Sequence, residues 1–401
     1  MATPNQESYP HLRGARPVLP RARGIQTEWL IAASMTATLL VAGALAAIGP
    51  VRADASPPTV FHLSAGTNYT VVPYVSSVDG WNLSYEEFLP TGFTPRATYP
   101  LVVYLHGLQP DGAKWVSGGV PSDFVSLLNQ SSGGGPTIRG IVQNASTLGY
   151  LLIAPNTRTG EGFYQNTVCG GPQEQDILDA VAHEVKGRHV SSVYLIGFSM
   201  GAMGALNLAA HHPGKFAAVA VAGTPTDRFA GYAYRQYAIS IGEQWANQSL
   251  FAETTGTCGS GPGQGNATTD AVYAYGSVVR LHPQSLAGVP IWVAAGGADT
   301  RVPTNPSIFA FSQVNNTFVN STCLVFPGEP SNCTTTLWSL HNATPSLYKF
   351  RYVYEPGAVH SPSQFDPADI FAFFAGKKSA GFFTSATVPP VKLVANPHPG
   401  S

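Results

Sequence analysis

A serine lies between two glycines in the segment Gly197-Phe198-Ser199-Met200-Gly201, whose first residue ends the apolar run VYLIG. This G-x-S-x-G pattern, placed between a strand-like run and a helix-like segment, is typical of a sharp turn that exposes a nucleophilic serine. A serine hydroxyl attacks a carbonyl only when a base removes its proton, so a histidine and a carboxylate must accompany it. For the motif by itself, a glycine-rich turn without chemistry is the alternative.

Two further segments supply those groups in the chain order Ser, Asp, His. The run IWVAA leads into a glycine-rich loop that contains Asp299, and the run FRYVY leads into a loop that contains His360. Both residues follow the carboxyl end of a predicted strand, and an open α/β sheet collects its functional residues at that edge. The sequence therefore predicts a catalytic triad of Ser199, Asp299 and His360. Asp227 and Glu355 are the alternative acids.

The same chemistry places negative charge on a carbonyl oxygen, which backbone N–H groups have to bind. The serine motif offers the N–H of Met200. The segment LVVYLHGLQPDG offers a second donor, where Gly107 permits a close approach and Leu108 donates its N–H. We expect His106 to orient this loop or to contact the substrate. Chemistry of this kind requires neither a metal ion nor an organic cofactor.

The elements that position these residues follow a regular alternation of short apolar runs and helix-length segments. Near-continuous apolar strands separated by helices predict the α/β class, with a mostly parallel, doubly wound sheet and helices on both faces. The segments YTVVPYVS and WNLSYEEFLP, which come first, are typical of antiparallel edge strands. The predicted strands of the parallel sheet are residues 101–105, 150–154, 193–197, 217–222, 291–295 and 350–354. The predicted helices are residues 121–130, 173–187, 200–212, 304–314 and 365–375.

Two segments interrupt this alternation. Residues 226–285 follow a predicted strand at the carboxyl edge of the sheet, and we expect them to form a cap over the site. Tyr232, Tyr234 and Trp245 of this cap are candidates for contact with the substrate, with packing inside the cap as the alternative. Residues 315–347 are rich in Ser, Thr and Asn and predict a surface loop.

The four cysteines favour an oxidising compartment outside the cytoplasm. Cys323 and Cys333 are close enough in sequence to close the loop of residues 315–347 with a disulfide, and Cys169 and Cys258 remain as a second pair. Many N-x-S/T sequons in loop-like segments predict a glycosylated outer surface.

The N-terminal part predicts the route to that compartment. A basic segment, residues 1–28, precedes an uncharged apolar stretch, residues 29–49. At about 1.5 Å per residue this stretch is long enough to cross the roughly 30 Å hydrocarbon core, with the basic flank on the cytoplasmic side. A signal sequence cleaved after Ala55 is the alternative. Beyond it we expect a linker at residues 50–64, the domain with the predicted triad at residues 65–376, and a loose tail at residues 377–401.

Composition restricts the class of partner. Charged residues make up 11% of the chain and the formal net charge is -1, so nucleic acid meets no broad basic surface. We therefore expect a substrate and a membrane as partners, and no nucleic acid.

The segments YLHGLQPDG, YLIGFSMGAMGALNLAAHHPGKFAAVAVAGTP, AGGADTRVP and GAVHSPSQFDPADIFAFF together resemble the α/β-hydrolases, and more narrowly the secreted polyhydroxybutyrate depolymerases and feruloyl esterases. The resemblance implies the α/β-hydrolase fold with a cap insertion, and an esterase that cleaves a polymeric or aromatic ester through an acyl-enzyme. It also implies the nucleophile at Ser199, the acid at Asp299 and the base at His360. Val359 and Ser361 depart from the pattern of that group around the histidine, and this departure concerns the substrate more than the mechanism.

Two alternatives to an esterase remain at this point. A serine peptidase or amidase of the prolyl-oligopeptidase type would use the same residues on amide bonds. An inactive surface protein would keep the hydrolase fold for recognition and use the sequons and the cap as its working surface.

Overall fold

The computed structural model divides the chain into two compact units, Met1–Asp54 and Ala55–Ser401. All described residues belong to the second unit. They are residues 59–62, 68–107, 123–158, 166–167, 171–224, 228, 267–277, 283–286, 288–302, 350–355 and 357–379.

Several predicted features lie outside the described residues. These are the basic segment and apolar stretch of residues 1–49, the helix at 304–314, the loop at 315–347 and all four cysteines. The disulfides, the anchor and its alternative, the cleaved signal sequence, therefore stay predictions. Within the part of the chain that the structure describes, no helix is long and apolar enough to cross a membrane.

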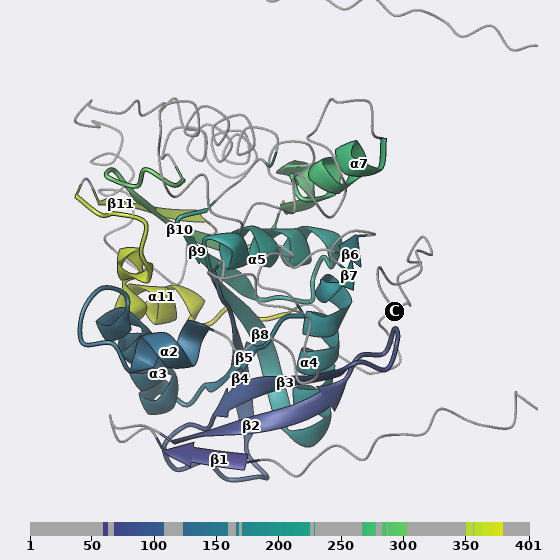
Figure 1. Cartoon of the computed structure of the whole chain (residues 1–401). Coiled ribbons are helices and arrows are strands. Elements are labelled where there is room, and N and C mark those ends of the chain that lie inside the picture. The colour runs from purple at the N-terminus through teal and green to yellow at the C-terminus, as the bar shows by residue number, and fades with distance from the viewer. Residues whose placement is uncertain are drawn as a thin grey trace, which may run out of the picture. The chain divides into compact units, whose positions relative to one another are not determined.

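A nine-stranded sheet forms the centre of the described part, in the order β1-β2-β3-β5-β4-β8-β9-β10-β11 (Figure 1). β1, β2 and β3 pair antiparallel, and β3 joins β5 antiparallel. From β5 onward all neighbours pair parallel. The strands are β1 (Thr59–His62), β2 (Asn68–Val75), β3 (Asn82–Phe88), β4 (Thr98–Leu105), β5 (Leu151–Pro155), β8 (His189–Phe198), β9 (Ala218–Ala222), β10 (Ile291–Gly296) and β11 (Phe350–Glu355). A separate short pair consists of β6 (Asn166–Thr167) and β7 (Gly171–Pro172).

Helices cover both faces of this sheet, which confirms the predicted α/β class. Because successive strand residues point to opposite faces, the strands feed two separate cores. Side chains of α4 and α5 pack in one core, and side chains of α2, α3 and α11 pack in the other. The helices are α2 (Asp123–Leu128), α3 (Gly135–Leu148), α4 (Gln173–Gly187), α5 (Met200–His211), α7 (Ala267–Tyr275) and α11 (Pro367–Phe374), with short 3-10 helices η3 (Pro283–Leu286) and η5 (Pro362–Gln364).

The structure corrects two expectations. The linker prediction for residues 50–64 is wrong at Thr59–His62, because these residues pair with Asn68–Val71 and extend the antiparallel edge as β1. Helix α3 was not predicted, although its buried residues Ile138, Ile141, Val142 and Ala145 have helical spacing. Polar residues and glycines lie between and beside these apolar residues, so the helical pattern is weak in the sequence.

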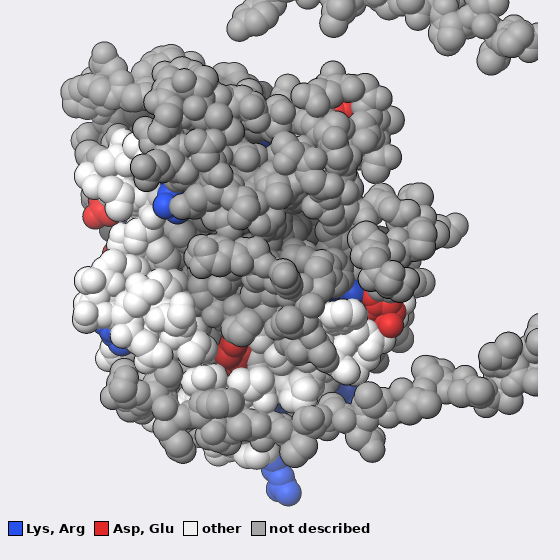
Figure 2. Space-filling model, viewed as in Figure 1, with Lys and Arg blue, Asp and Glu red and all other residues white. Residues whose placement is uncertain are grey.

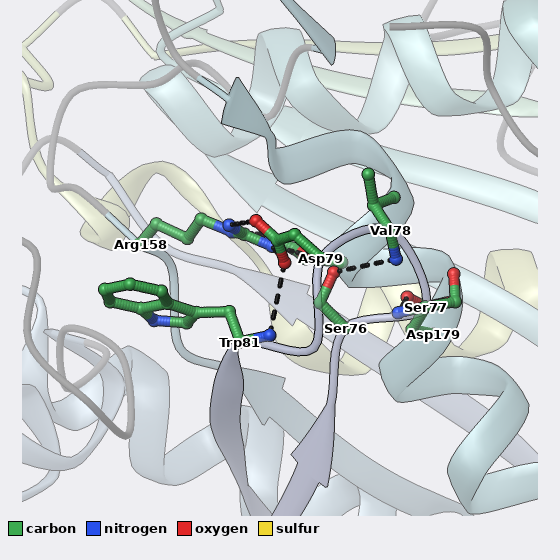
Figure 3. Close-up of polar contacts among 8 residues, drawn as sticks. Ser76, Ser77, Val78, Asp79, Trp81, Arg158 and Asp179 are labelled. Atoms are coloured by element: carbon green, nitrogen blue, oxygen red, sulfur yellow. Dashed lines mark hydrogen bonds and ion pairs between the residues drawn. The ribbon is translucent and has the colours of Figure 1, made fainter. Parts of the chain in front are cut away.

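The turn between β2 and β3 is tied to the sheet edge by a buried arginine (Figure 3). Arg158 follows β5 and is 1% exposed. Its Nη1 and Nη2 donate to Asp79 at 2.5 and 2.8 Å, and its Nε and Nη2 donate to Asp176 of α4 at 2.5 and 2.9 Å. Ser77 N also donates to Asp179 Oδ2 of α4 at 2.7 Å. The hairpin is therefore fixed to the carboxyl edge of the parallel strands and to α4.

Charged side chains are sparse on the described surface. On the face seen in Figure 2, the described part shows a few scattered acidic and basic side chains among uncharged ones. The described part of this face therefore presents no extended basic patch for nucleic-acid phosphates.

A buried pair of carboxyl groups lies between β3 and α4. Glu184 and Glu87 are each 3% exposed; Tyr85 Oη donates to Glu184 Oε2 at 2.8 Å, and Arg188 Nη2 donates to Glu87 Oε1 at 2.7 Å. Burial, and then the charge of Glu87, raise the pKa of Glu184 to about 8. Between about pH 4.5 and 8, Glu184 is protonated in the folded protein and ionised in the unfolded chain. The folded protein therefore binds more protons than the unfolded chain in this pH range. The contribution of Glu184 to stability therefore falls as pH rises from about 4.5 to 8.

We expect Glu184→Gln to remove this pH dependence, because the amide has no proton to lose and its oxygen still accepts from Tyr85. The free energy of unfolding of wild type, measured relative to that of the variant, should fall toward pH 8 by up to about 1.4 kcal/mol for each pH unit. The variant should be close to wild type at pH 5 and more stable at pH 8, as measured by urea denaturation. Lys186→Gln, on the exposed side of α4, is the control and should follow wild type. Parallel curves for wild type and Glu184→Gln would contradict the raised pKa.

Candidate functional site

Ser199 lies in the sharp turn between β8 and α5, at the carboxyl edge of the sheet. Its backbone has φ 54° and ψ −117°, and it is the one non-glycine residue with positive φ among the described residues. Such a conformation costs on the order of 1–3 kcal/mol and concentrates at functional sites. The turn is held by the Ser199 N–H, which donates to the carbonyl of Ala222 on β9 at 3.0 Å.

Two glycines make this turn sterically possible. A β-carbon at Gly201 would lie 2.0 Å from the carbonyl oxygen of Leu105, at the end of β4. One at Gly197 would lie 2.2 Å from the carbonyl oxygen of Gly201. The first turn of α5 therefore lies against the neighbouring strand with no room for larger residues.

A chain of hydrogen bonds joins the three residues of the predicted triad. His360 Nε2 lies 2.8 Å from Ser199 Oγ, and His360 Nδ1 lies 2.8 Å from Asp299 Oδ2. A carboxylate only accepts, so Nδ1 carries the proton and Nε2 is free to accept from the serine hydroxyl. The other oxygen of Asp299 accepts from the N–H groups of Arg301 and Val302 at 3.0 and 2.8 Å. The structure thus brings together a hydroxyl, an imidazole and a fixed carboxylate in the order that activates a serine.

The chain has the α/β-hydrolase fold. A serine on a strained strand-to-helix turn above a mostly parallel sheet, with the acid and the histidine following in that chain order, is the arrangement of this fold. Asp299 follows β10 and His360 follows β11, at the same edge of the sheet as Ser199.

A family model and several solved structures are similar to this chain. The model of the Esterase family, described as putative esterase, matches residues 163–323. No curated protein matches the sequence. Among solved structures, the acylaminoacyl peptidase of Pyrococcus horikoshii is similar with a TM-score of 0.48 and 13% identity, over 78% of this chain and 43% of the peptidase. The chain therefore spans less than half the length of that enzyme.

Two solved structures of more similar length also resemble the chain. A ferulic acid esterase has a TM-score of 0.45 and 14% identity, over 76% of this chain and 94% of the esterase. An S-formylglutathione hydrolase from Agrobacterium tumefaciens has a TM-score of 0.41 and 14% identity, over 79% of this chain and 93% of the hydrolase.

The residues around the imidazole were not predicted from the sequence. His360 lies beside the ring of Phe198, with 4.9 Å between ring centroids. Gly223 has φ +55°, and a β-carbon there would lie 3.2 Å from His360 Cε1. Gln364 Nε2 donates to Asp299 Oδ2 at 3.1 Å. Their sequence signals are weak, since Gly223 only follows a strand and Gln364 only lies four residues beyond the histidine.

The predicted oxyanion donors are described in part. Met200 is the first residue of α5, where an N–H has no partner within the helix and the helix dipole favours negative charge. Gly107 follows β4 at the same edge of the sheet, whereas Leu108 lies outside the described residues.

His106 is placed to orient the loop and not to contact a substrate. Its side chain is fully buried; Nδ1 donates to the carbonyl of Gly107 at 2.6 Å, and Nε2 accepts from Thr157 Oγ1 at 3.0 Å. Burial lowers the pKa of His106 to about 4, so the ring is neutral at physiological pH. Of the two expected roles, the structure favours orientation, because the ring has no exposed surface to offer a substrate.

Of the remaining candidate residues, the structure describes only Glu355. Tyr232, Tyr234, Trp245 and the alternative acid Asp227 lie outside the described residues. Glu355, the other alternative acid, is exposed at the end of β11, and Asp299 is the residue bonded to His360. Within the described ranges, no group of three or more acidic, histidine or cysteine residues is arranged to hold a metal ion.

We expect Gly201→Ala to destabilise the fold, because its β-carbon would overlap the carbonyl oxygens of Leu105 and His106. Overpacking of this kind costs about 1–3 kcal/mol, and here the obstacle is rigid backbone. Thermal unfolding followed by circular dichroism measures the loss. Gly187→Ala, at the end of α4 with open space around it, is the matched control and should unfold at or slightly above the wild-type temperature. Equal stability of the two variants would show that α5 is not in tight contact with β4.

Proposed function

We propose that this protein is a serine hydrolase that cleaves carboxylic esters through an acyl-enzyme. The observation that carries the proposal is the hydrogen-bonded chain from Ser199 Oγ through His360 to Asp299 Oδ2. Burial strengthens these contacts, since the side chain of Asp299 is 1% exposed and that of His360 is 11% exposed. Such a pair in low dielectric holds the imidazole in one tautomer and stabilises it when it becomes charged.

The proposed reaction begins when Ser199 Oγ attacks the ester carbonyl and His360 Nε2 takes the hydroxyl proton. The tetrahedral intermediate then collapses, the bond to the alcohol breaks, and His360 returns the proton to the leaving oxygen. Water repeats the sequence on the acyl-enzyme and releases the acid and the free serine. Asp299 remains ionised throughout and stabilises the imidazolium.

The oxyanion is proposed to rest on the N–H of Met200 and on a second N–H at Leu108. A well-placed donor of this kind contributes about 3–4 kcal/mol to the transition state. The neutral ring of His106 orients this loop, because its hydrogen bond to the Gly107 carbonyl fixes the peptide group that precedes Leu108. Since His106 is neutral well above pH 4, its support should not change over the working range of the enzyme.

An ester is preferred over an amide as the proposed substrate because the family model that matches is that of the esterases. The resemblance to depolymerases and feruloyl esterases favours a polymeric or aromatic ester. A peptidase of the prolyl-oligopeptidase type is the second candidate, and the intact serine–histidine contact speaks against an inactive recognition protein. We further propose an extracytoplasmic location, with residues 29–49 as anchor or signal sequence, on the apolar length and the sequons of the sequence.

A fluorophosphonate probe applied to the full chain should form an adduct on Ser199, located by mass spectrometry of the tryptic peptides. Ser199→Ala and His360→Ala should lose the adduct, and hydrolysis of an aryl ester should fall by a factor on the order of 10⁴ or more, because the triad acts as a unit. Ser191→Ala, an exposed serine on the same strand, is the control and should keep both. Full turnover by folded Ser199→Ala would refute the proposed nucleophile.

A matched aryl ester and anilide, with the same acyl group, should separate the esterase from the peptidase. We expect kcat/KM for the ester to exceed that for the anilide by several orders of magnitude, because an amine is a poorer leaving group and needs a better-placed proton donor. A comparable kcat/KM for the two would assign the protein to the peptidases. Ser199→Ala supplies the background rate for both substrates.

A further inference from the structure

The side-chain amide of Gln364 joins three chain segments beside the proposed triad. Gln364 ends η5, four residues after His360, and is 3% exposed. Its Nε2 donates to Asp299 Oδ2 at 3.1 Å and to the carbonyl of Val359 at 2.8 Å. Its Oε1 accepts from the N–H of Gly223 at 2.9 Å. The acid loop after β10, the histidine loop after β11 and the end of β9 therefore meet at one buried amide.

These three contacts fix which way the amide lies. The carboxylate and the carbonyl only accept, so the NH₂ group has to face them, and the backbone N–H only donates, so the oxygen has to face Gly223. Both protons of Nε2 are then used. A carboxylic acid at this position could donate to only one of the two acceptors, and only when protonated.

Two glycines provide the space for this arrangement. A β-carbon at Gly296, the last residue of β10, would lie 2.8 Å from Gln364 Nε2 and 2.2 Å from the carbonyl oxygen of Ala358. Gly223 presents its N–H to the amide with φ +55°, a conformation that disfavours other residues. The ends of two neighbouring strands thus leave room for the glutamine and for the loop that carries His360.

We propose that Gln364 is a positioning residue of the reaction proposed above, acting through Asp299 and the histidine loop. Asp299 Oδ2 accepts a hydrogen bond from His360 Nδ1–H, and it accepts a second one from Gln364 Nε2. Together with the two backbone N–H groups on Oδ1, this contact prevents rotation of the carboxylate. The bond to Val359, the residue before His360, holds the imidazole over Ser199. This inference rests on the proposed function.

An uncharged donor is important at this position. It binds the carboxylate of Asp299 without contributing a charge of its own, so the negative charge stays available to the imidazolium. A second carboxylate here would lie about 3 Å from the first, and two such groups cannot both ionise freely, so the pair would retain a proton.

Gln364→Glu therefore tests whether Gln364 positions Asp299, because a change of pH alone makes or breaks the contact within one folded variant. At low pH the shared proton keeps one hydrogen bond between the two carboxyl groups, and activity should approach that of wild type. As the pair loses this proton, repulsion should displace Asp299, and kcat for the aryl ester should fall at least tenfold across a pH range in which wild type is flat. KM should change by less than threefold, because the amide lies behind the triad. Ser363→Glu, an exposed neighbour, is the charge control and should show no such fall.

Gln364→Met removes the hydrogen bonds and keeps the volume. We expect its kcat to be reduced about tenfold to a hundredfold at every pH, with fluorophosphonate labelling of Ser199 slowed by a similar factor. A wild-type pH profile and kcat in folded Gln364→Glu would overturn the inference, and so would a variant that is only less heat-stable with unchanged kcat. Absence of labelling in the wild-type protein would instead refute the proposed function, so the two failures are distinguishable.

Discussion

The first turn of α5 lies against the end of β4 so closely that Gly201 has no space for a β-carbon. This contact forces the chain to leave β8 through a sharp turn, and the strain falls on Ser199, at φ 54°. The same turn directs the start of α5, with the N–H of Met200, toward the edge where β4 continues into His106 and Gly107. One steric constraint therefore places the proposed nucleophile and one proposed oxyanion donor in a common region.

The acid and the base come from loops that support each other. Gly297 N donates to the carbonyl of Glu355 at 2.8 Å, and Ala298 N donates to that of Ala358 at 3.1 Å. Backbone bonds between the two loops thus set the distance from Asp299 to His360 before the side chains contribute. Glu355, considered as an acid from its sequence position, acts here through its backbone carbonyl.

Buried polar groups hold the C-terminal end of α5, the helix that begins beside Ser199. Glu174 of α4 is 1% exposed and accepts from His211 and His212 at the end of α5 and from Tyr275 of α7, the last two at 2.6 Å. Burial alone would raise the pKa of Glu174, but the hydrogen bonds from the two histidines outweigh it and lower the pKa to about 2. Since Arg158 also binds Asp176, polar contacts tie the first turn of α4 to α5, α7 and the β2–β3 turn. The helix that begins beside Ser199 is therefore held at both ends.

The sequence by itself determined the class of fold, because apolar runs such as 101–105 and 193–197 alternate with helical segments and burial on both faces requires such runs. It also gave the order Ser199, Asp299, His360, since local motifs place each residue at a strand end. It did not reveal α3, whose apolar stripe is sparse, or β1, whose pairing with β2 is decided by contacts outside its own segment. Only the tertiary structure decided that the ring of His106 is buried and neutral, and that Gly223 and Gln364 contact the triad. These properties depend on contacts between residues 51 to 141 positions apart in the chain, and no local pattern encodes such contacts.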